Sequence, residues 1–358
     1  MKRPRLKRTL ERIETPDGDV LLLRSSGDAI TVTAPDEEDR ALLNALDGSH
    51  SLPDLERRFS TAGEVIGQMA ALGLIEDAAE FERVPPLELE RFDRQLRYFS
   101  DVAASGVSPA KCQERLREAR IAVLGVGGLG GRVAFELACI GIGELRLVDG
   151  DVVELSNLNR QIQYSEEDLG TLKVEATARR LRAFNSQVRV ETSAKRLESQ
   201  ADVAEFIAGA DVVVDAADWP PQEIERFCNA ACFEAGIPYI SMSHEPPLAR
   251  IGPFFVPGVT GCHCCEQIAA RRDYPLYEVV TEQLRGNRSP APTLGPACGL
   301  TGGLVAIEVM HFLTGLIEPA TLGTAHIYDL RTMEVERRGV DREPSCPVCA
   351  RLCENRRS

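Results

Sequence analysis

The chain has 358 residues, of which 44% are hydrophobic and 27% are charged, and this composition excludes a wholly disordered or fibrous protein. Asp and Glu outnumber Lys and Arg by 55 to 41. The net charge of −14 therefore argues against general nucleic-acid binding, which depends on Lys and Arg at phosphates. We find no apolar run of about 20 residues and no apolar segment behind the basic N-terminus. We therefore expect no membrane span and no signal peptide, and we place the protein in the cytoplasm.

Residues 1–88 are predicted to form a small domain of short strands and three short helices. Alternating apolar residues over 19–35 predict two strands with a turn at Ser26–Asp28, and another strand begins at Ile75. Helical spacing of apolar residues predicts the helices within 41–48, 52–59 and 64–74. This order is typical of a winged-helix-like domain, and the acidic run 36–39 disfavours DNA as its ligand. Pro85 and Pro86 mark a predicted linker into the next domain.

Residues 89–358 are predicted to form one α/β domain. Short apolar strands alternate with amphipathic helices, which predicts a Rossmann-like, doubly wound and mostly parallel sheet. The expected strands cover 120–126, 144–150, 188–194, 211–217 and 238–243, and the clearest helices cover 131–143, 173–185 and 223–236. We expect the C-terminal residues to complete the same domain.

A glycine-rich turn between the first strand and the first helix of this domain predicts a nucleotide site. Gly125, Gly127, Gly128 and Gly130 would let a phosphate approach the backbone at the positive end of the helix. Asp149 ends the following strand, where a carboxylate can accept hydrogen bonds from ribose hydroxyls. These features alone fit both mononucleotide and dinucleotide binders, so a dehydrogenase that uses NAD remains open at this point.

The residues that follow favour a triphosphate over hydride chemistry. Arg160 lies in a polar loop with Asn157 and Gln161, and Lys173 opens a helix, which supplies two cations near the glycine turn. Asp215 and Asp218 end a buried strand, where a carboxylate beside a triphosphate is a natural Mg²⁺ ligand. Any one of these residues alone could be an ordinary surface charge.

The eleven cysteines include two CxxC pairs that predict a metal site. Cys262 with Cys265 and Cys346 with Cys349 could hold a closed, structural Zn²⁺ through four thiolates. Cys264 and Cys353 are close enough to be alternative ligands, and free buried thiols are the competing interpretation. A zinc ion there would tie the C-terminal tail to the main domain.

From about residue 90 to residue 350 the chain resembles the ThiF/MoeB/HesA superfamily of adenylating enzymes, which are related to ubiquitin-activating proteins. The resemblance lies in GVGGLG, the aspartate after the second strand, SNLNRQ, GTLKV and DAAD. It implies an ATP-dependent adenylyltransferase, and members commonly carry the same four-cysteine zinc site. The implied ATP and Mg²⁺ contacts are Gly125, Gly127, Gly128, Gly130, Asp149, Asp151, Ser156, Asn157, Arg160, Gln161, Lys173 and Asp218. Arg94 matches an arginine that reaches the triphosphate in the partner subunit of a homodimer, and Trp219 departs from the Asn that many members carry there.

The N-terminal domain and the VPGVTGC segment indicate which branch of the superfamily this chain resembles. The domain resembles PqqD-like modules, in which a leader peptide adds a strand to a sheet edge, and VPGVTGC resembles the MccB/PaaA peptide-adenylating enzymes. We therefore expect activation of a carboxylate or amide of a precursor peptide. The alternatives are activation of a ubiquitin-like sulfur carrier and a non-catalytic scaffold that binds a leader peptide, and the N-terminal domain could be only a packing or dimerisation appendage. Cys298, in a segment predicted as a loop, is the one cysteine considered for a thioester role.

Overall fold

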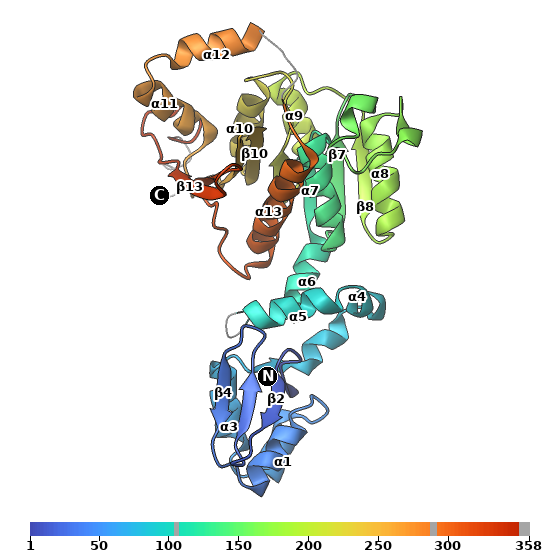
Figure 1. Ribbon diagram of the computed structural model, residues 1–358, viewed down its shortest axis with the longest axis vertical. Coiled ribbons are helices and arrows are strands. Elements are labelled where there is room, and N and C mark those ends of the chain that lie inside the picture. The colour runs from blue at the N-terminus through green and yellow to red at the C-terminus, as the bar shows by residue number, and fades with distance from the viewer. Residues whose placement is uncertain (104–106, 287–291, 351–358) are drawn as a thin grey trace. The chain divides into compact units, whose positions relative to one another are not determined.

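The computed structural model of the chain describes residues 1–103, 107–286 and 292–350 (Figure 1). The chain forms two compact units. The first contains Met1–Arg115 and Thr314–Ile317, and the second contains Leu116–Leu313 and Glu318–Ser358. That residues 1–88 alone form a peptide-recognition domain stays a prediction.

The first unit begins with two small sheets and three helices. The three helices and the strands over 20–23, 29–32 and 75–77 were predicted, whereas the strands over 4–6 and 11–14 were not. The two-stranded sheet pairs β1 with β5, and the three-stranded antiparallel sheet has the order β2-β3-β4. Their bounds are β1 Pro4–Leu6, β2 Glu11–Glu14, β3 Val20–Leu23, β4 Ala29–Val32, α1 Glu37–Ala45, α2 Leu52–Arg58, α3 Ala62–Ala71 and β5 Ile75–Asp77. Asp36 begins α1 with a capping box, and Ser51 caps α2. Leu42, Leu55 and Ile66 bring the three helices into one core with Val20 and Leu22.

The segment around Pro85, which was predicted as a linker, is helical. Pro86 stands in the first turn of a helix, where its missing N–H leaves no hydrogen bond unmade. The helices of this segment are η1 Ala78–Arg83, α4 Pro86–Arg91, α5 Asp93–Val102 and α6 Pro109–Glu118.

The second unit is built on an eight-stranded sheet of order β13-β12-β11-β10-β9-β6-β7-β8. The five strands from β10 to β8 in that order are parallel, and β11, β12 and β13 extend the sheet in antiparallel fashion. The strands are β6 Arg120–Leu124, β7 Glu144–Val148, β8 Arg189–Ser193, β9 Val212–Asp215, β10 Tyr239–Glu245, β11 Leu248–Phe255, β12 Thr324–Asp329 and β13 Glu334–Gly339. The chain leaves β6 toward β7 and β8 and then returns to β9 on the other side of β6. Ligands of open parallel sheets bind at such a reversal, outside the carboxyl ends of the strands.

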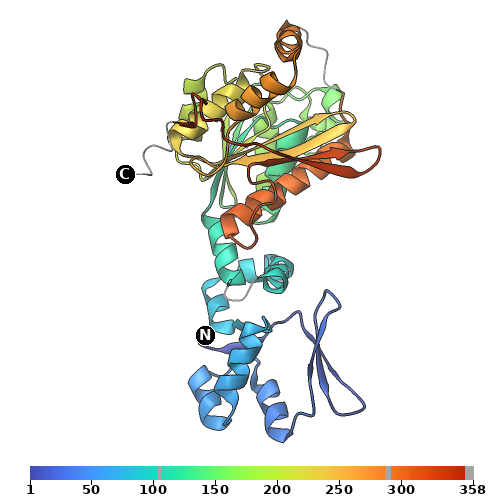
Figure 2. The same cartoon turned by 90° about the vertical axis from the view of Figure 1, so that its left-hand side faces the viewer.

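Helices cover both faces of this sheet, as Figure 2 shows. One core joins strands β6, β7, β9 and β10 to helices α9 and α10, and it includes the four cysteines of the two CxxC pairs. The helices are α7 Gly128–Cys139, η2 Leu155–Asn157, η3 Glu166–Asp168, α8 Lys173–Phe184, α9 Gln200–Ile207, α10 Ile224–Ala235, α11 His263–Asp273, α12 Tyr277–Gly286 and α13 Gly295–Thr314. The predicted doubly wound, mostly parallel sheet is confirmed.

Helix α13 corrects two expectations from the sequence. It is long and apolar enough, by length and composition, to cross a membrane, although no such run was predicted; 56% of its most apolar window is buried. It also begins at Gly295, so Cys298 lies in a helix and not in the predicted loop. The early glycines and Pro296 were the reason for expecting a loop, and proline is tolerated in the first turn of a helix.

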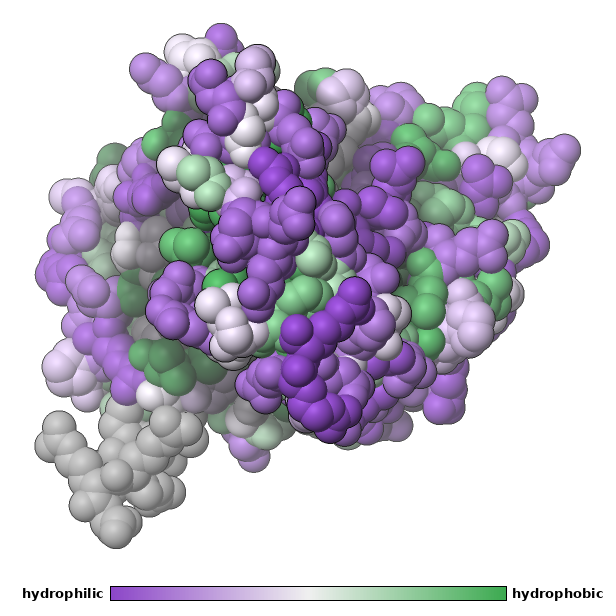
Figure 3. All heavy atoms as spheres, turned by 90° about the horizontal axis from the view of Figure 1, so that it is seen from below, coloured by the Kyte–Doolittle hydropathy of each residue, from purple (hydrophilic) through white to green (hydrophobic). Residues whose placement is uncertain are grey.

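The molecular face in Figure 3 is mainly hydrophilic, with small separate apolar patches.

Candidate functional site

The glycine turn joins β6 to α7 at the point where the strand order reverses. Gly125 has a φ of +80°, which favours glycine, and a Cβ there would lie 2.9 Å from the carbonyl oxygen of Ala216, just beyond β9. A Cβ on Gly130 would lie 1.9 Å from the carbonyl oxygen of Gly125. Gly127 precedes the first turn of α7, whose N-terminal amides can bind an anion. The predicted phosphate-binding turn thus has the required close packing.

Asp149 ties the loop after β7 to this turn. Its Oδ2 accepts the backbone N–H of Val126 at 3.0 Å, and its Oδ1 accepts the N–H of Asp151 at 2.9 Å. Burial raises the pKa of Asp149 above its ordinary value, against the opposing effect of the Lys173 charge. The carboxylate therefore fixes the geometry of the turn, and its role at a ribose stays a prediction.

Asp151 holds two cations at the same edge of the sheet. Lys173 Nζ donates to its Oδ2 at 3.0 Å, and Arg196 Nη2 donates to its Oδ1 at 2.8 Å. Burial acts to raise the pKa of Asp151, but the bonds and charges of Lys173 and Arg196 outweigh it, so the pKa lies below the usual range. Lys173 is buried at the start of α8, and its charge is directed to this loop.

The loop after residue 154 brings Arg160 to the glycine turn. Arg160 Cγ lies 3.5 Å from the position of a Cβ on Gly128, and its Nη1 donates to the carbonyl oxygen of Ser156 at 2.8 Å. Asn157 is buried, and its Oδ1 accepts the N–H of Glu154 at 3.0 Å. Gln161 Nε2 lies 3.7 Å from a Cβ position on Gly127. Of the predicted residues of this loop, Arg160 and Gln161 thus adjoin the glycine turn, while Ser156 and Asn157 make hydrogen bonds within the loop itself.

Two residues that the sequence analysis missed bind carbonyl oxygens of the glycine turn. Gln163 Nε2 donates to the carbonyl oxygens of Val126 and Gly127 at 2.9 and 3.1 Å. The Tyr164 hydroxyl donates to the same Val126 oxygen at 2.8 Å and accepts from Thr177 at 3.1 Å. Both residues lie just after the segment 159–161, and this position was the signal in the sequence that could have identified them.

The two aspartates at the end of β9 lie in different environments. Asp215 is buried, and burial, aided by the negative charge of Glu225, raises its pKa to about 7. Within the described residues, Asp215 Oδ1 has no hydrogen-bond partner. Asp218 is exposed in the loop beyond the strand, so it is the one of the two that can present a charged carboxylate to a ligand.

Arg94 and Cys298 are the two remaining residues for which the sequence analysis considered a role. Arg94 is exposed on α5 of the first unit, and its role at a triphosphate stays a prediction. Cys298 is buried, and its Sγ lies 2.9 Å from a Cβ position on Gly128 and 3.5 Å from Thr293 Oγ1. This thiol adjoins the turn, but a buried thiol is poorly placed to act as a nucleophile.

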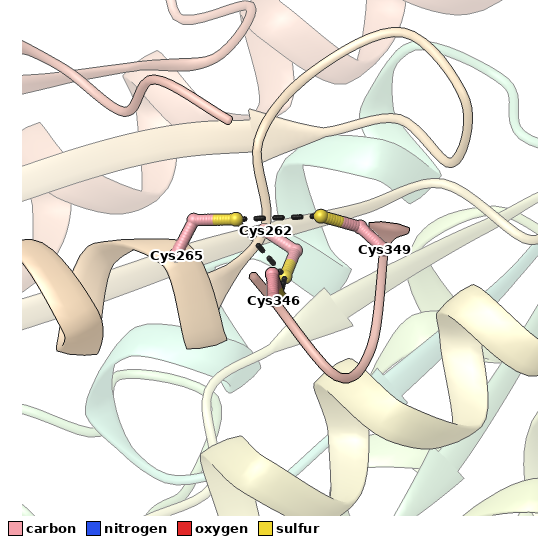
Figure 4. A group of neighbouring side chains, drawn as sticks. All are labelled: Cys262, Cys265, Cys346 and Cys349. Atoms are coloured by element: carbon pink, nitrogen blue, oxygen red, sulfur yellow. Dashed lines mark hydrogen bonds between the residues drawn. The ribbon is translucent and has the colours of Figure 1, made fainter. Parts of the chain in front are cut away.

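The four predicted metal-binding cysteines lie together, as Figure 4 shows. Their sulfur atoms all lie within 4.8 Å of one another, with Cys262 to Cys265 at 3.8 Å, Cys262 to Cys346 at 3.5 Å and Cys265 to Cys349 at 3.3 Å. Tetrahedral Zn–S bonds of about 2.3 Å require sulfur separations close to these. Cys264 lies outside the group, and Cys353 lies outside the described residues. The cluster therefore fits a closed, structural zinc site.

Comparison with known proteins finds similarity over most of the chain. A family model described as the ThiF family matches residues 92–348. The sulfur carrier protein ThiS adenylyltransferase of Escherichia coli (strain K12) is 32% identical over 259 residues, which cover 72% of this chain and 94% of that protein. The SAMP-activating enzyme E1 of Haloferax volcanii is 33% identical over 268 residues, covering 73% and 89%.

Solved structures match the chain almost from end to end. The structure of E. coli MccB with ATP has a TM-score of 0.76 and 25% identity, and the match covers 98% of this chain and 100% of that one. The structure of PaaA has a TM-score of 0.74 and 26% identity, with 93% and 99% covered. Both structural matches therefore include the first unit, most of which lies outside the family match.

Proposed function

Because this chain belongs to the ThiF family of adenylyltransferases, we propose that its substrate is a ribosomally made precursor peptide, which it activates with ATP. A carboxylate or amide of the peptide is adenylated and pyrophosphate is released, as a step in the maturation of a peptide natural product. The single observation that carries this choice is the whole-chain similarity to MccB, which covers 98% of the chain and includes the residues before position 92. Structures of MccB also include MccA as a bound partner.

The proposed reaction is an in-line substitution at the α-phosphorus of ATP. For a carboxylate substrate, one carboxylate oxygen forms a bond to the α-phosphorus, and the bond from that phosphorus to the bridging oxygen breaks, so that pyrophosphate carries away the electron pair. Lys173 and Arg160 stabilise the negative charge on the phosphates, and Arg94 of a second copy of the chain adds to this in the proposed homodimer. The amides of the glycine turn orient the phosphates, with Asp149, Asp151, Ser156, Asn157 and Gln161 around them.

Asp218 is the proposed protein ligand of Mg²⁺. Its exposed carboxylate at the end of β9 fits a cation that is bound by one or two carboxylates and the phosphates of the substrate. When bound, this ion neutralises phosphate charge. The four clustered cysteines are proposed to hold Zn²⁺ in a structural role, because four thiolates leave no open coordination position.

The three-stranded sheet of the first unit supports the proposed peptide recognition. Strands β2 and β4 are the outer strands of that sheet within the described residues, and an extended peptide can pair with such an edge. We propose that the leader part of the precursor binds there as an added strand.

The test is ATP–pyrophosphate exchange with precursor peptides encoded beside this chain. We expect exchange that depends on the full precursor and is inhibited by its leader half supplied as a separate peptide. Exchange with no peptide response, but with a response to a small carrier protein, would contradict the proposal. That result would favour the second candidate, activation of a sulfur-carrier protein, which the 32% identity to the ThiS adenylyltransferase supports. Absence of exchange with both substrate types would favour a scaffold.

A further inference from the structure

A cavity of about 230 Å³ lies within the first unit, and two of the side chains that line it are cations. Lys7 and Arg24 supply the positive charges, Asp101 supplies a carboxylate, and Leu10 and Leu72 supply apolar surface. Pockets for drug-sized ligands begin at about 300 Å³, so this smaller cavity suits a single side chain of a ligand.

Both cations have hydrogen-bond donors left for a ligand. Lys7 Nζ donates to the carbonyl oxygen of Ser100, and Arg24 Nη2 donates to that of Leu72 at 2.5 Å. An ammonium has three N–H donors and a guanidinium has five, so each group can bind a further acceptor. Among the described residues, neither cation forms an ion pair with a carboxylate. Because both side chains are half-buried, water compensates their charge only in part.

The charges at this cavity leave an excess of one positive charge. Burial lowers the pKa of Lys7, against the opposing effect of Glu76 and Asp101, and the positive charge of Arg24 lowers that pKa as well. Glu76 is engaged elsewhere, because Arg5 Nη2 donates to its Oε1 at 2.6 Å. Asp101 alone therefore faces two cations that repel each other, and one bound carboxylate would balance the charge.

The cavity lies at one end of the three-stranded sheet. Glu11 of β2 pairs with Leu23 of β3, and Leu23 pairs with Ala29 of β4, so all three strands have an end here. Leu10 directly precedes β2, and Arg24 directly follows β3. A peptide that lies along either outer strand and continues beyond this end therefore comes within reach of the cavity.

We propose that this cavity binds the side-chain carboxylate of an acidic residue in the leader part of the precursor peptide, between Lys7 and Arg24. The inference rests on the proposed function and adds one specific contact to the pairing of the leader with the sheet. Because the rest of the precursor follows the leader, the carboxylates that the leader offers are those of Asp and Glu side chains. Hydrogen bonds from Lys or Arg to a carboxylate are charge-assisted and roughly twice as strong as neutral ones.

The test measures how tightly the full-length protein binds the synthetic leader half of the precursor encoded beside this chain, by fluorescence anisotropy. Replacing each Asp or Glu of the leader by Asn or Gln should identify one carboxylate whose loss weakens binding about tenfold. Lys7→Met and Arg24→Gln should each weaken binding of the unaltered leader about tenfold, and binding of the leader without that carboxylate less than twofold. Asp101→Asn should tighten binding of the unaltered leader, because it removes a competing negative charge.

Arg57→Gln is the matched control, because this arginine of α2 is 75% exposed and does not line the cavity. It should leave leader binding unchanged. Thermal unfolding separates recognition from a purely structural role. If Lys7 and Arg24 only fasten the last turns of α5 and α3, both variants will lower the melting temperature and leave leader binding unchanged, which would overturn the inference.

Equal losses with both leaders, or a leader whose acidic residues can all be replaced without loss, would also overturn the carboxylate contact. If the contact is found but the precursor supports no ATP–pyrophosphate exchange, the proposed function is wrong and the contact stands. If exchange occurs and the leader binds without this coupling, the contact is wrong and the proposed function stands. A leader that does not bind would overturn the contact, and exchange would then decide the proposed function alone.

Discussion

Lys173 and Arg196 bind opposite oxygens of the same carboxylate, that of Asp151, at 3.0 and 2.8 Å. Lys173 starts α8 and Arg196 follows β8, so the Asp151 carboxylate draws cations from two separate segments to one place. A triphosphate carries more negative charge than Asp151, and we expect it to compete with this carboxylate for both cations. The proposed nucleotide site therefore has two positive charges in place, each paired with Asp151, before a nucleotide binds.

Lys173→Ala should reduce peptide-dependent ATP–pyrophosphate exchange at least a hundredfold, because a buried cation at the phosphates is removed. Stability should change little, because Asp151 keeps Arg196 as a partner and is itself 48% exposed. The measurements are exchange kinetics and thermal unfolding. Lys111→Ala, at an exposed lysine of the first unit, is the control. Unchanged exchange in Lys173→Ala would remove this residue from the proposed mechanism.

Gly130→Ala should abolish ATP binding and lower the free energy of unfolding. The new Cβ would lie 1.9 Å from the carbonyl oxygen of Gly125, so the turn would have to move. Gly299→Ala, on helix α13, is a matched control with no atom within 4 Å of the new Cβ among the described residues, and it should be neutral or stabilise by about 0.5–1 kcal/mol. Calorimetric ATP titration and thermal unfolding of both variants check this; ATP binding by Gly130→Ala would contradict it.

Asp215 should make the protein less stable as the pH rises from about 4 to about 7. Its pKa is raised to about 7 in the folded protein and is near 3.8 when unfolded, so the folded state binds more protons within this window. The penalty is complete above the folded pKa and amounts to about 4 kcal/mol at most. Asp215→Asn should lose this component of the pH dependence, as measured by denaturant unfolding from pH 4 to pH 8. Parallel pH profiles for the two proteins would show that the acid is not buried in this way.

Cys262→Ser should lower the zinc content from about one ion per chain to near zero and reduce the melting temperature. Cys139→Ser, at a thiol outside the cluster, should do neither. Metal analysis of purified protein and thermal unfolding with and without a chelator provide the readouts. Equal zinc content in the two variants would count against the site.

Much of the fold could be predicted because its signals are local. The glycine turn and the buried strands each depend on a few adjacent residues, and the structure confirms those elements. The contacts of Asp151 with Lys173 and Arg196 depend on residues 22 and 45 positions away, which no spacing rule can pair. The start of α13 was missed because glycine and proline indicate a loop locally, whereas in the structure Gly295 and Pro296 form the first turn of the helix, where proline is tolerated.

The two CxxC pairs affect which part of the chain unfolds first. Cys262 and Cys346 are 84 residues apart, so a metal ion shared by them closes a covalent-like ring around α11, α12, α13, β12 and β13. Such a ring reduces the entropy of the unfolded chain, and somewhat more than a short ring would. Protease digestion of the metal-depleted protein should therefore cut first within this ring, while the strands before β10 still resist cleavage.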